Sequence, residues 1–147
     1  DDGLNISEGF IAIGEKRLRV EYSSPSKILI ILDKDKAMYY NYDLDEDEFF
    51  DPKNTLGWYF FEIFKGSDFF SNSEILAKKN IIQLEKTGVV EDELYNLKLY
   101  FEDNPLIIRK IELTTDETYI SLAFFGHTHD KVFDKKYFKL INPIFFD

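Results

Sequence analysis

The feature that most constrains the fold is a run of five aliphatic residues, Ile28 to Leu32, within the segment Lys27 to Asp33. Its β-branched residues favour a strand. Side chains of a strand alternate between the two faces of its sheet, so an unbroken apolar strand has apolar groups on both faces. We therefore expect each face of this sheet to be covered by a lid or by a partner layer.

The segments around this strand share its β-forming composition, and turns containing Pro25 or the sequence Asp-Lys-Asp-Lys separate them. The segments are Glu8 to Ile13, Arg17 to Tyr22 and Ala37 to Tyr42. This order predicts an antiparallel meander. The second segment alternates strictly, which predicts one dry face and one wet face. The dry face holds Leu18, Val20 and Tyr22, and the wet face holds Arg17, Arg19 and Glu21.

One short helix is expected in the middle of the chain, from Thr55 to Phe64, with Asn54-Thr55 as an N-cap pair and an end near Gly66. Its residues are apolar nearly all round, so it does not lie on a surface with one face in water. We expect this helix either to be buried or to cover a site that is not always filled.

After this helix the sequence returns to strand-like patterns. Ser67 to Leu76 is expected to be helical or irregular. The predicted strands are Ile81 to Glu85, Leu94 to Phe101, Pro105 to Leu113, Thr118 to Phe125 and a final one at Tyr137 to Ile141. Strands at intervals of about ten residues, interrupted once by a helix, predict a curved antiparallel sheet or open barrel with helices on one side. The expected fold class is mainly β with a few short helices, in a single domain over residues 1–147.

Charge and hydropathy exclude several partners. The formal net charge is −10, from 28 acidic and 18 basic residues, which argues against a nucleic-acid partner or a bare anionic membrane surface. No apolar run approaches the roughly 18 to 20 residues needed to cross a bilayer, so stable membrane insertion is not expected. The sequence opens without Met, and we expect that a signal peptide and a first helix precede Asp1.

Metal-binding chemistry has weak support. His127 and His129, with Asp130, give at most three local ligands, and Gly126 beside them favours a loop between strands. The acidic run Asp43 to Glu48 is expected to be a solvated loop, with a calcium site as the minor alternative. No metal site and no cofactor are therefore predicted.

The sequence also gives no support for an enzyme, because it has no Cys and no nucleophile or phosphate-loop motif. The anomaly is aromatic: the chain has 15 Phe, nine Tyr and one Trp. Ordinary core packing explains each residue singly, but the collective excess of apolar surface favours a pocket for a hydrophobic ligand. The residues that stand out are Leu18, Val20, Ile30, Met38, Tyr40, Trp58, Phe60, Phe61, Phe64, Phe69 and Phe124.

Several segments together resemble the LolA-type periplasmic carrier of outer-membrane lipoproteins. They are Gly9-Phe10, Lys16 to Tyr22 followed by Pro25, Leu32-Asp33, Tyr40 to Leu44, Asn54-Thr55-Leu56, Pro105-Leu106 to Glu112-Leu113, Thr118 to Phe125 and Phe138 to Pro143. Two positions depart from the family pattern. Gly14-Glu15 stands where the family has Arg-Pro, and Leu56 replaces the Pro of its Thr-Pro-Leu helix start.

The resemblance implies an unclosed β-barrel with a helical lid, whose hydrophobic cavity takes up the acyl chains of a lipoprotein. It further implies a periplasmic location, an inner-membrane ABC transporter that releases the cargo, and an outer-membrane receptor that accepts it. We expect a monomer.

We assign the expected cavity wall to Leu18, Val20, Ile30, Met38 and Tyr40, and the lid to Trp58, Phe60, Phe61 and Phe64. Two other functions stay open. One is a lipid- or peptide-sensing domain on the same scaffold. The other is a metal-dependent enzyme that uses His127 and His129.

Overall fold

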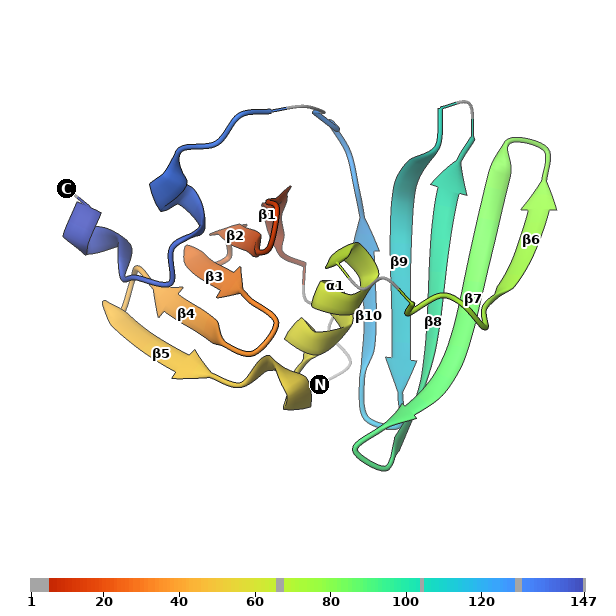
Figure 1. Ribbon diagram of the computed structural model, residues 1–147, viewed down its shortest axis with the longest axis horizontal. Coiled ribbons are helices and arrows are strands. Elements are labelled where there is room, and N and C mark those ends of the chain that lie inside the picture. The colour runs from red at the N-terminus through yellow and green to blue at the C-terminus, as the bar shows by residue number, and fades with distance from the viewer. Residues whose placement is uncertain (1–5, 66–67, 104, 129–130, 147) are drawn as a thin grey trace. The chain divides into compact units, whose positions relative to one another are not determined.

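The computed structural model describes residues 6–65, 68–103, 105–128 and 131–146, and these residues form two compact units (Figure 1). Unit 1 combines Asp1–Ser67 with Val132–Asp147, and unit 2 is Asp68–Lys131. Unit 2 is thus inserted between two stretches of chain that fold together. The single domain expected from chain length stays a prediction.

Unit 1 contains a five-stranded antiparallel sheet whose strands pair in chain order. The strands are β1 (Glu8–Ile13), β2 (Leu18–Ser24), β3 (Ile28–Leu32), β4 (Ala37–Asn41) and β5 (Glu46–Phe50). The predicted meander is confirmed. The solvated loop expected at Asp43 to Glu48 is wrong for its second half, because Glu46 to Glu48 belong to edge strand β5. There the side chains are exposed while the backbone pairs with β4.

Apolar clusters cover β3 on both faces, as its unbroken apolar sequence predicts. The α1-side cluster consists of the buried residues Leu18, Leu32 and Ala37. The opposite-face cluster consists of Leu29, Ile31, Met38 and Tyr40, against which Tyr42 and Leu140 pack. Because consecutive residues of β3 enter different clusters, both sides of this strand are removed from water.

The single α-helix of the described residues, α1 (Leu56–Lys65), confirms the predicted helix with a shift of one residue. Thr55 caps it, since its Oγ1 accepts a hydrogen bond from the Gly57 N–H at 3.1 Å. The short 3₁₀-helix η1 (Pro52–Asn54) precedes it. A Cβ on Gly57 would lie 2.9 Å from Leu32 Cδ2, so this glycine lets the helix approach the sheet closely.

Residues from the end of unit 1 contact the charged face of β2. Arg19 Nη1 donates to the Tyr137 carbonyl at 2.7 Å, and its guanidinium carbon lies 4.1 Å from the centre of the Tyr137 ring. Glu21 pairs with Arg19 at 3.1 Å, and the two side chains are only 14% and 18% exposed. The predicted wet face is therefore wrong at these residues.

The same residues also correct a strand prediction. The strand predicted at Tyr137 to Ile141 is not formed. The 3₁₀-helix η2 (Lys135–Phe138) includes the start of this segment, and a second 3₁₀-helix, η3 (Pro143–Phe146), follows it. Phe133, Tyr137 and Phe138 form a cluster of three rings with centroids 4.9 to 5.3 Å apart. Local aromatic packing thus replaces strand pairing here.

Unit 2 is a second five-stranded antiparallel sheet, also paired in chain order. Its strands are β6 (Glu74–Lys78), β7 (Ile81–Val90), β8 (Glu93–Glu102), β9 (Ile107–Thr115) and β10 (Tyr119–Ala123). The four strands predicted between Ile81 and Phe125 are confirmed, although β7 is twice as long as expected. Ser67 to Leu76 is irregular over the described residues up to Ser73, and strand β6 begins at Glu74.

One face of the unit 2 sheet is apolar, and its buried residues are Tyr95, Leu97, Leu99, Ile111 and Leu113. Tyr95 lies directly over Gly88, its cross-strand partner, so a Cβ on Gly88 would be 2.8 Å from the ring. The Tyr95 ring also stacks on Phe69, with centroids 6.4 Å apart. A glycine therefore makes room for an aromatic side chain on this face.

The other face of this sheet carries a polar network centred on Glu112. Its carboxylate accepts hydrogen bonds from the Tyr100 hydroxyl at 2.7 Å and the Tyr119 hydroxyl at 2.8 Å. Lys110 Nζ lies 3.4 Å from the same carboxylate. The two tyrosine hydrogen bonds and Lys110 together outweigh burial and hold the pKa of Glu112 below its usual value.

The fold of the described residues is therefore mainly β, with two unclosed five-stranded antiparallel sheets and one α-helix. None of the helices in the described ranges has the length and apolar character needed to cross a membrane.

Candidate hydrophobic ligand site

The sequence of α1, LGWYFFEIFK, places four aromatic residues in succession, so they surround the helix instead of forming one stripe. Phe60, Phe61 and Phe64 pack against the α1-side cluster. From the sheet, Val20 and Ile30 contact the same cluster. The predicted wall and lid residues Leu18, Val20, Ile30, Phe60, Phe61 and Phe64 are thus brought together in unit 1.

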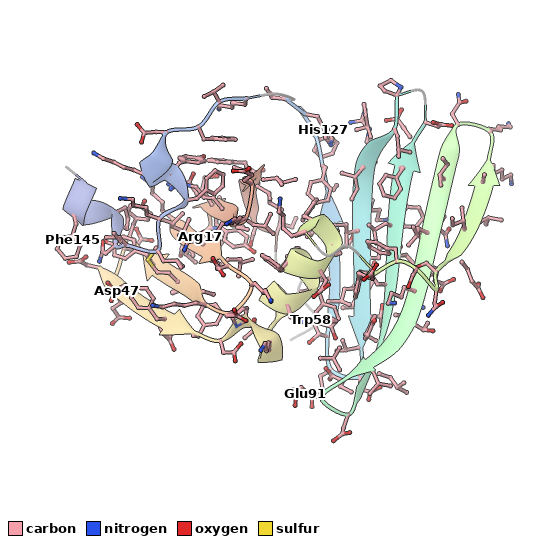
Figure 2. The ribbon with its side chains drawn as sticks, viewed as in Figure 1. Arg17, Asp47, Trp58, Glu91, His127 and Phe145 are labelled. Atoms are coloured by element: carbon pink, nitrogen blue, oxygen red, sulfur yellow. The ribbon has the colours of Figure 1, made fainter. Side chains whose placement is uncertain are left out.

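The aromatic residues of α1 differ in burial. Tyr59 is only 6% exposed, whereas Trp58, Phe60, Phe61 and Phe64 are half-buried. Trp58, which Figure 2 labels on α1, meets the Tyr59 ring edge-to-face with centroids 5.1 Å apart. The helix therefore covers an apolar sheet face with rings that still have accessible surface.

Both ends of α1 are fixed to the sheet by specific contacts. At its C-terminal end, Lys65 Nζ donates to the carbonyl oxygen of Gly14, in the β1–β2 turn, at 2.6 Å. At its N-terminal end, Gly57 allows contact with Leu32.

Met38 and Tyr40, also predicted as wall residues, lie in the opposite-face cluster. The register explains this, since Met38 pairs with Ile31 and Tyr40 with Leu29. Cross-strand partners share a face, so neither residue is on the face of Ile30. The structure does not bring Met38 and Tyr40 together with the other predicted site residues.

Polar contacts also fix the opposite face of the sheet. The Tyr40 hydroxyl donates to the Asp45 carboxylate at 2.7 Å, and this hydrogen bond, together with burial, raises the pKa of Tyr40 to about 12. Asn142, which is 8% exposed, donates to Asp47 of β5 at 3.1 Å. These bonds indicate a structural role for the face that holds Tyr40.

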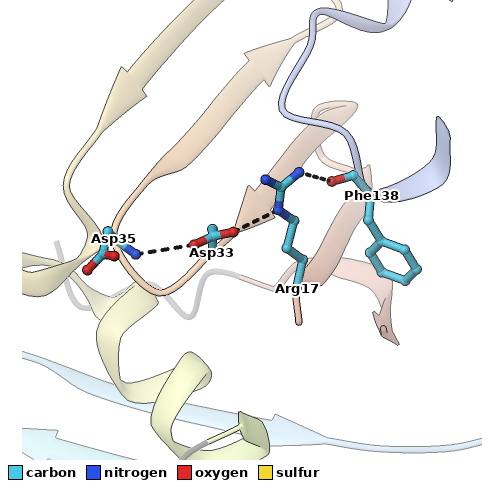
Figure 3. A network of polar contacts seen from close by, with 4 residues as sticks. All are labelled: Arg17, Asp33, Asp35 and Phe138. Carbon is cyan, nitrogen blue, oxygen red and sulfur yellow. Dashed lines mark hydrogen bonds and ion pairs between the residues drawn. The ribbon is translucent and has the colours of Figure 1, made fainter. Parts of the chain in front are cut away.

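A second polar network links the β1–β2 turn, the end of β3 and the residues after unit 2 (Figure 3). Arg17 Nε donates to Asp33 at 2.8 Å, and Arg17 Nη1 donates to the Phe138 carbonyl at 3.0 Å. Burial alone would raise the pKa of Asp33. The Arg17 guanidinium and the backbone N–H groups of Lys34 and Asp35 outweigh it and hold this pKa below its usual value.

The remaining predicted candidates lie elsewhere. Phe69 is buried in unit 2 against Tyr95, and Phe124 is half-buried just beyond β10. His127 is exposed, while His129 and Asp130 lie outside the described residues. In the ranges that the structure describes, no three His, Asp or Glu side chains form a group that could hold a metal ion.

Sequence reasoning missed Leu32, Ala37 and Phe50 as members of the α1-side face. Strand alternation from Ile30 could have found Leu32. The β3–β4 pairing of Leu32 with Ala37 and the β4–β5 pairing of Ala37 with Phe50 then add the other two. Lys65 carried no signal, because its partner is a backbone carbonyl 51 positions away.

Comparison with known proteins does not add to this geometry. No protein-family model matches the chain, and no curated protein is significantly similar to it.

Proposed function

We propose that this protein is a non-enzymatic carrier that shields the acyl chains of lipoproteins beneath α1. The observation that supports this most is the half-buried aromatic helix packed on an apolar sheet face. A cover that opens needs rings that pack on the sheet and still keep part of their surface accessible, as these do. The proposed cavity lies between Phe60, Phe61 and Phe64 and the sheet residues Val20 and Ile30.

The energetic need for such a site is large. An acyl chain of about 15 methylenes costs roughly 12 kcal/mol to expose to water, at about 0.8 kcal/mol for each CH₂. It therefore needs a protein surface that covers it during transfer. The Lys65 hydrogen bond to the Gly14 carbonyl contributes to holding this cover on the sheet, and breaking it is one step by which the cover would open to release its cargo.

The setting of this activity is proposed from the LolA-type resemblance. The carrier acts in the periplasm, receives lipoproteins from an inner-membrane ABC transporter, and delivers them to an outer-membrane receptor. The strongly acidic composition is compatible with movement between anionic membrane surfaces without adsorption to either.

Displacement of a fluorescent fatty acid, with Trp58 emission as internal reporter, tests lipid binding directly. Trp58 is the only Trp of the chain, so a change in its emission reports on α1. We expect competition by palmitate and a shift of the Trp58 emission. Phe64→Ala should weaken binding, while Phe145→Ala, at a ring that is 74% exposed, provides the matched control.

A second variant tests the contact that holds α1, the proposed cover, to the β1–β2 turn. Lys65→Met keeps the length of the side chain but removes the hydrogen bond to the Gly14 carbonyl. Loss of a charge-assisted bond of about 1.5 kcal/mol or more should speed ligand release by roughly tenfold. A wild-type protein that neither binds palmitate nor changes its Trp58 emission would contradict the carrier proposal. Binding without handover to vesicle-bound receptor would favour the sensor alternative.

A further inference from the structure

The first strand of unit 2, β6, has an exposed free edge. β6 pairs with β7 on one side and ends the sheet on the other (Figure 1). All five of its residues, Glu74-Ile75-Leu76-Ala77-Lys78, are exposed, and Ile75 and Leu76 are 70% and 63% exposed. An exposed apolar edge strand is a template for pairing with another strand.

The register of the β6–β7 hairpin shows which backbone groups face outward. A two-residue loop, Lys79-Asn80, joins the strands, and Lys78 pairs with Ile81 across it. Residues that flank such a loop form a hydrogen-bonded pair, and bonded and non-bonded pairs then alternate. Glu74, Leu76 and Lys78 therefore direct their N–H and C=O groups toward β7, whereas Ile75 and Ala77 direct theirs to the free edge.

We infer that β6 pairs antiparallel with β6 of a second copy of this chain. With the two Leu76 residues on the two-fold axis, Ile75 of each copy lies opposite Ala77 of the other. These residues are the ones with outward backbone groups, so four inter-chain hydrogen bonds form. The same register places Glu74 opposite Lys78 twice, and opposite charges in cross-strand pairs are stabilising.

The charge pattern selects a second copy as the partner. Among the four edge strands of the described residues, only β6 has an acid at one end and a base at the other. β5 is acidic, so self-pairing would bring like charges together, and β1 has an irregular register at Glu8-Gly9 that protects an edge. A five-residue strand is a small interface, so the dimer is weak and concentration-dependent. It differs from the monomer expected from the sequence, and it is independent of lipid binding.

Charge reversal tests this register in the full chain. In Glu74→Lys and in Lys78→Glu, like charges lie opposite each other twice, and each variant alone should dimerise roughly tenfold more weakly. An equimolar mixture of the two variants restores Glu–Lys pairs and should form a heterodimer of wild-type affinity. Sedimentation equilibrium over a wide concentration range reads out the masses, from the 17.4 kDa of one chain to twice that value.

A backbone variant provides an independent test. Ala77→Pro removes an N–H that faces the free edge and leaves the β6–β7 hydrogen bonds in place, so it should abolish the dimer without unfolding the sheet. Circular dichroism checks that the variants retain their strands. A wild-type chain that stays at the mass of one copy at every concentration overturns the inference. So does a dimer that withstands Ala77→Pro and both charge reversals.

Discussion

The turn between β7 and β8 tests whether residues with positive φ lower the stability of this protein. Glu91 and Asp92 form this two-residue loop, and both have positive φ, 51° and 65° (Figure 2 labels Glu91). A hairpin loop of this type has φ > 0 at both central positions and favours Asn-Gly. Glu and Asp are therefore in conformations that L-residues adopt only at a cost, and Glu91→Asn combined with Asp92→Gly should stabilise the protein.

The size of the gain follows from two opposing terms. A non-glycine residue in the left-handed region costs roughly 1 to 2 kcal/mol, less for Asp and Asn, whose side chains bond locally. Glycine loses about 0.5 to 1 kcal/mol more backbone entropy on folding. The net expectation is a gain of about 1 kcal/mol. The melting temperature should then rise by about 2 to 4 °C if the whole chain unfolds together, and by about 4 to 8 °C if unit 2 unfolds alone.

Thermal and urea unfolding, followed by far-ultraviolet circular dichroism, measure this gain. Asp116→Gly is the matched control. Asp116 lies in the turn that joins β9 and β10, but its φ is not positive. Glycine there should destabilise the protein slightly. If the double variant melts at the wild-type temperature or below it, the reasoning from backbone strain is wrong.

Three further predictions concern single contacts. Gly88→Ala should destabilise the protein by about 1 to 3 kcal/mol in urea unfolding, because the new methyl group collides with the buried Tyr95 ring; unchanged stability would contradict this. The hydrogen bond to Glu112, with burial, raises the pKa of Tyr100 to about 12, above the unfolded value of 10. Its contribution to stability should be complete below pH 10 and lost as the pH rises toward 12, a dependence that Tyr100→Phe should remove and that alkaline unfolding measures. Arg19→Met should make residues 132–146 more sensitive to limited proteolysis, since it removes the contacts that hold them to β2; an unchanged cleavage rate would refute it.

Local sequence signals predicted most of the secondary structure. The alternation of Arg17 to Tyr22, the apolar run Ile28 to Leu32 and the cap before α1 each act within a few residues of chain, so strand and helix positions follow from them. β5 escaped prediction because an edge strand needs pairing on one side only and tolerates acidic side chains in water. The 3₁₀-helices after unit 2 escaped it because Tyr137 and Phe138 are organised by aromatic contacts instead of by strand pairing.

The candidate site was predicted only in part, for a related reason. Periodicity within one strand correctly grouped Leu18 with Val20, but it cannot show how a strand is aligned with its neighbour. A shift of one residue in the β3–β4 register exchanges the two faces of β4, and that register places Met38 away from Ile30. Contacts between a side chain and a distant carbonyl, such as Lys65 with Gly14, leave no pattern in the sequence.

The discontinuity of unit 1 has a consequence for how the chain is made. Arg17 of the β1–β2 turn and Arg19 of β2 find their carbonyl partners only in residues 137 and 138, which the ribosome adds after the whole of unit 2. At about 5 to 20 residues per second, the first five strands wait several seconds for these partners. During this interval the nascent sheet lacks the residues that contact its second face. Translation, by the order in which it delivers segments, thus sets the earliest moment at which unit 1 can close.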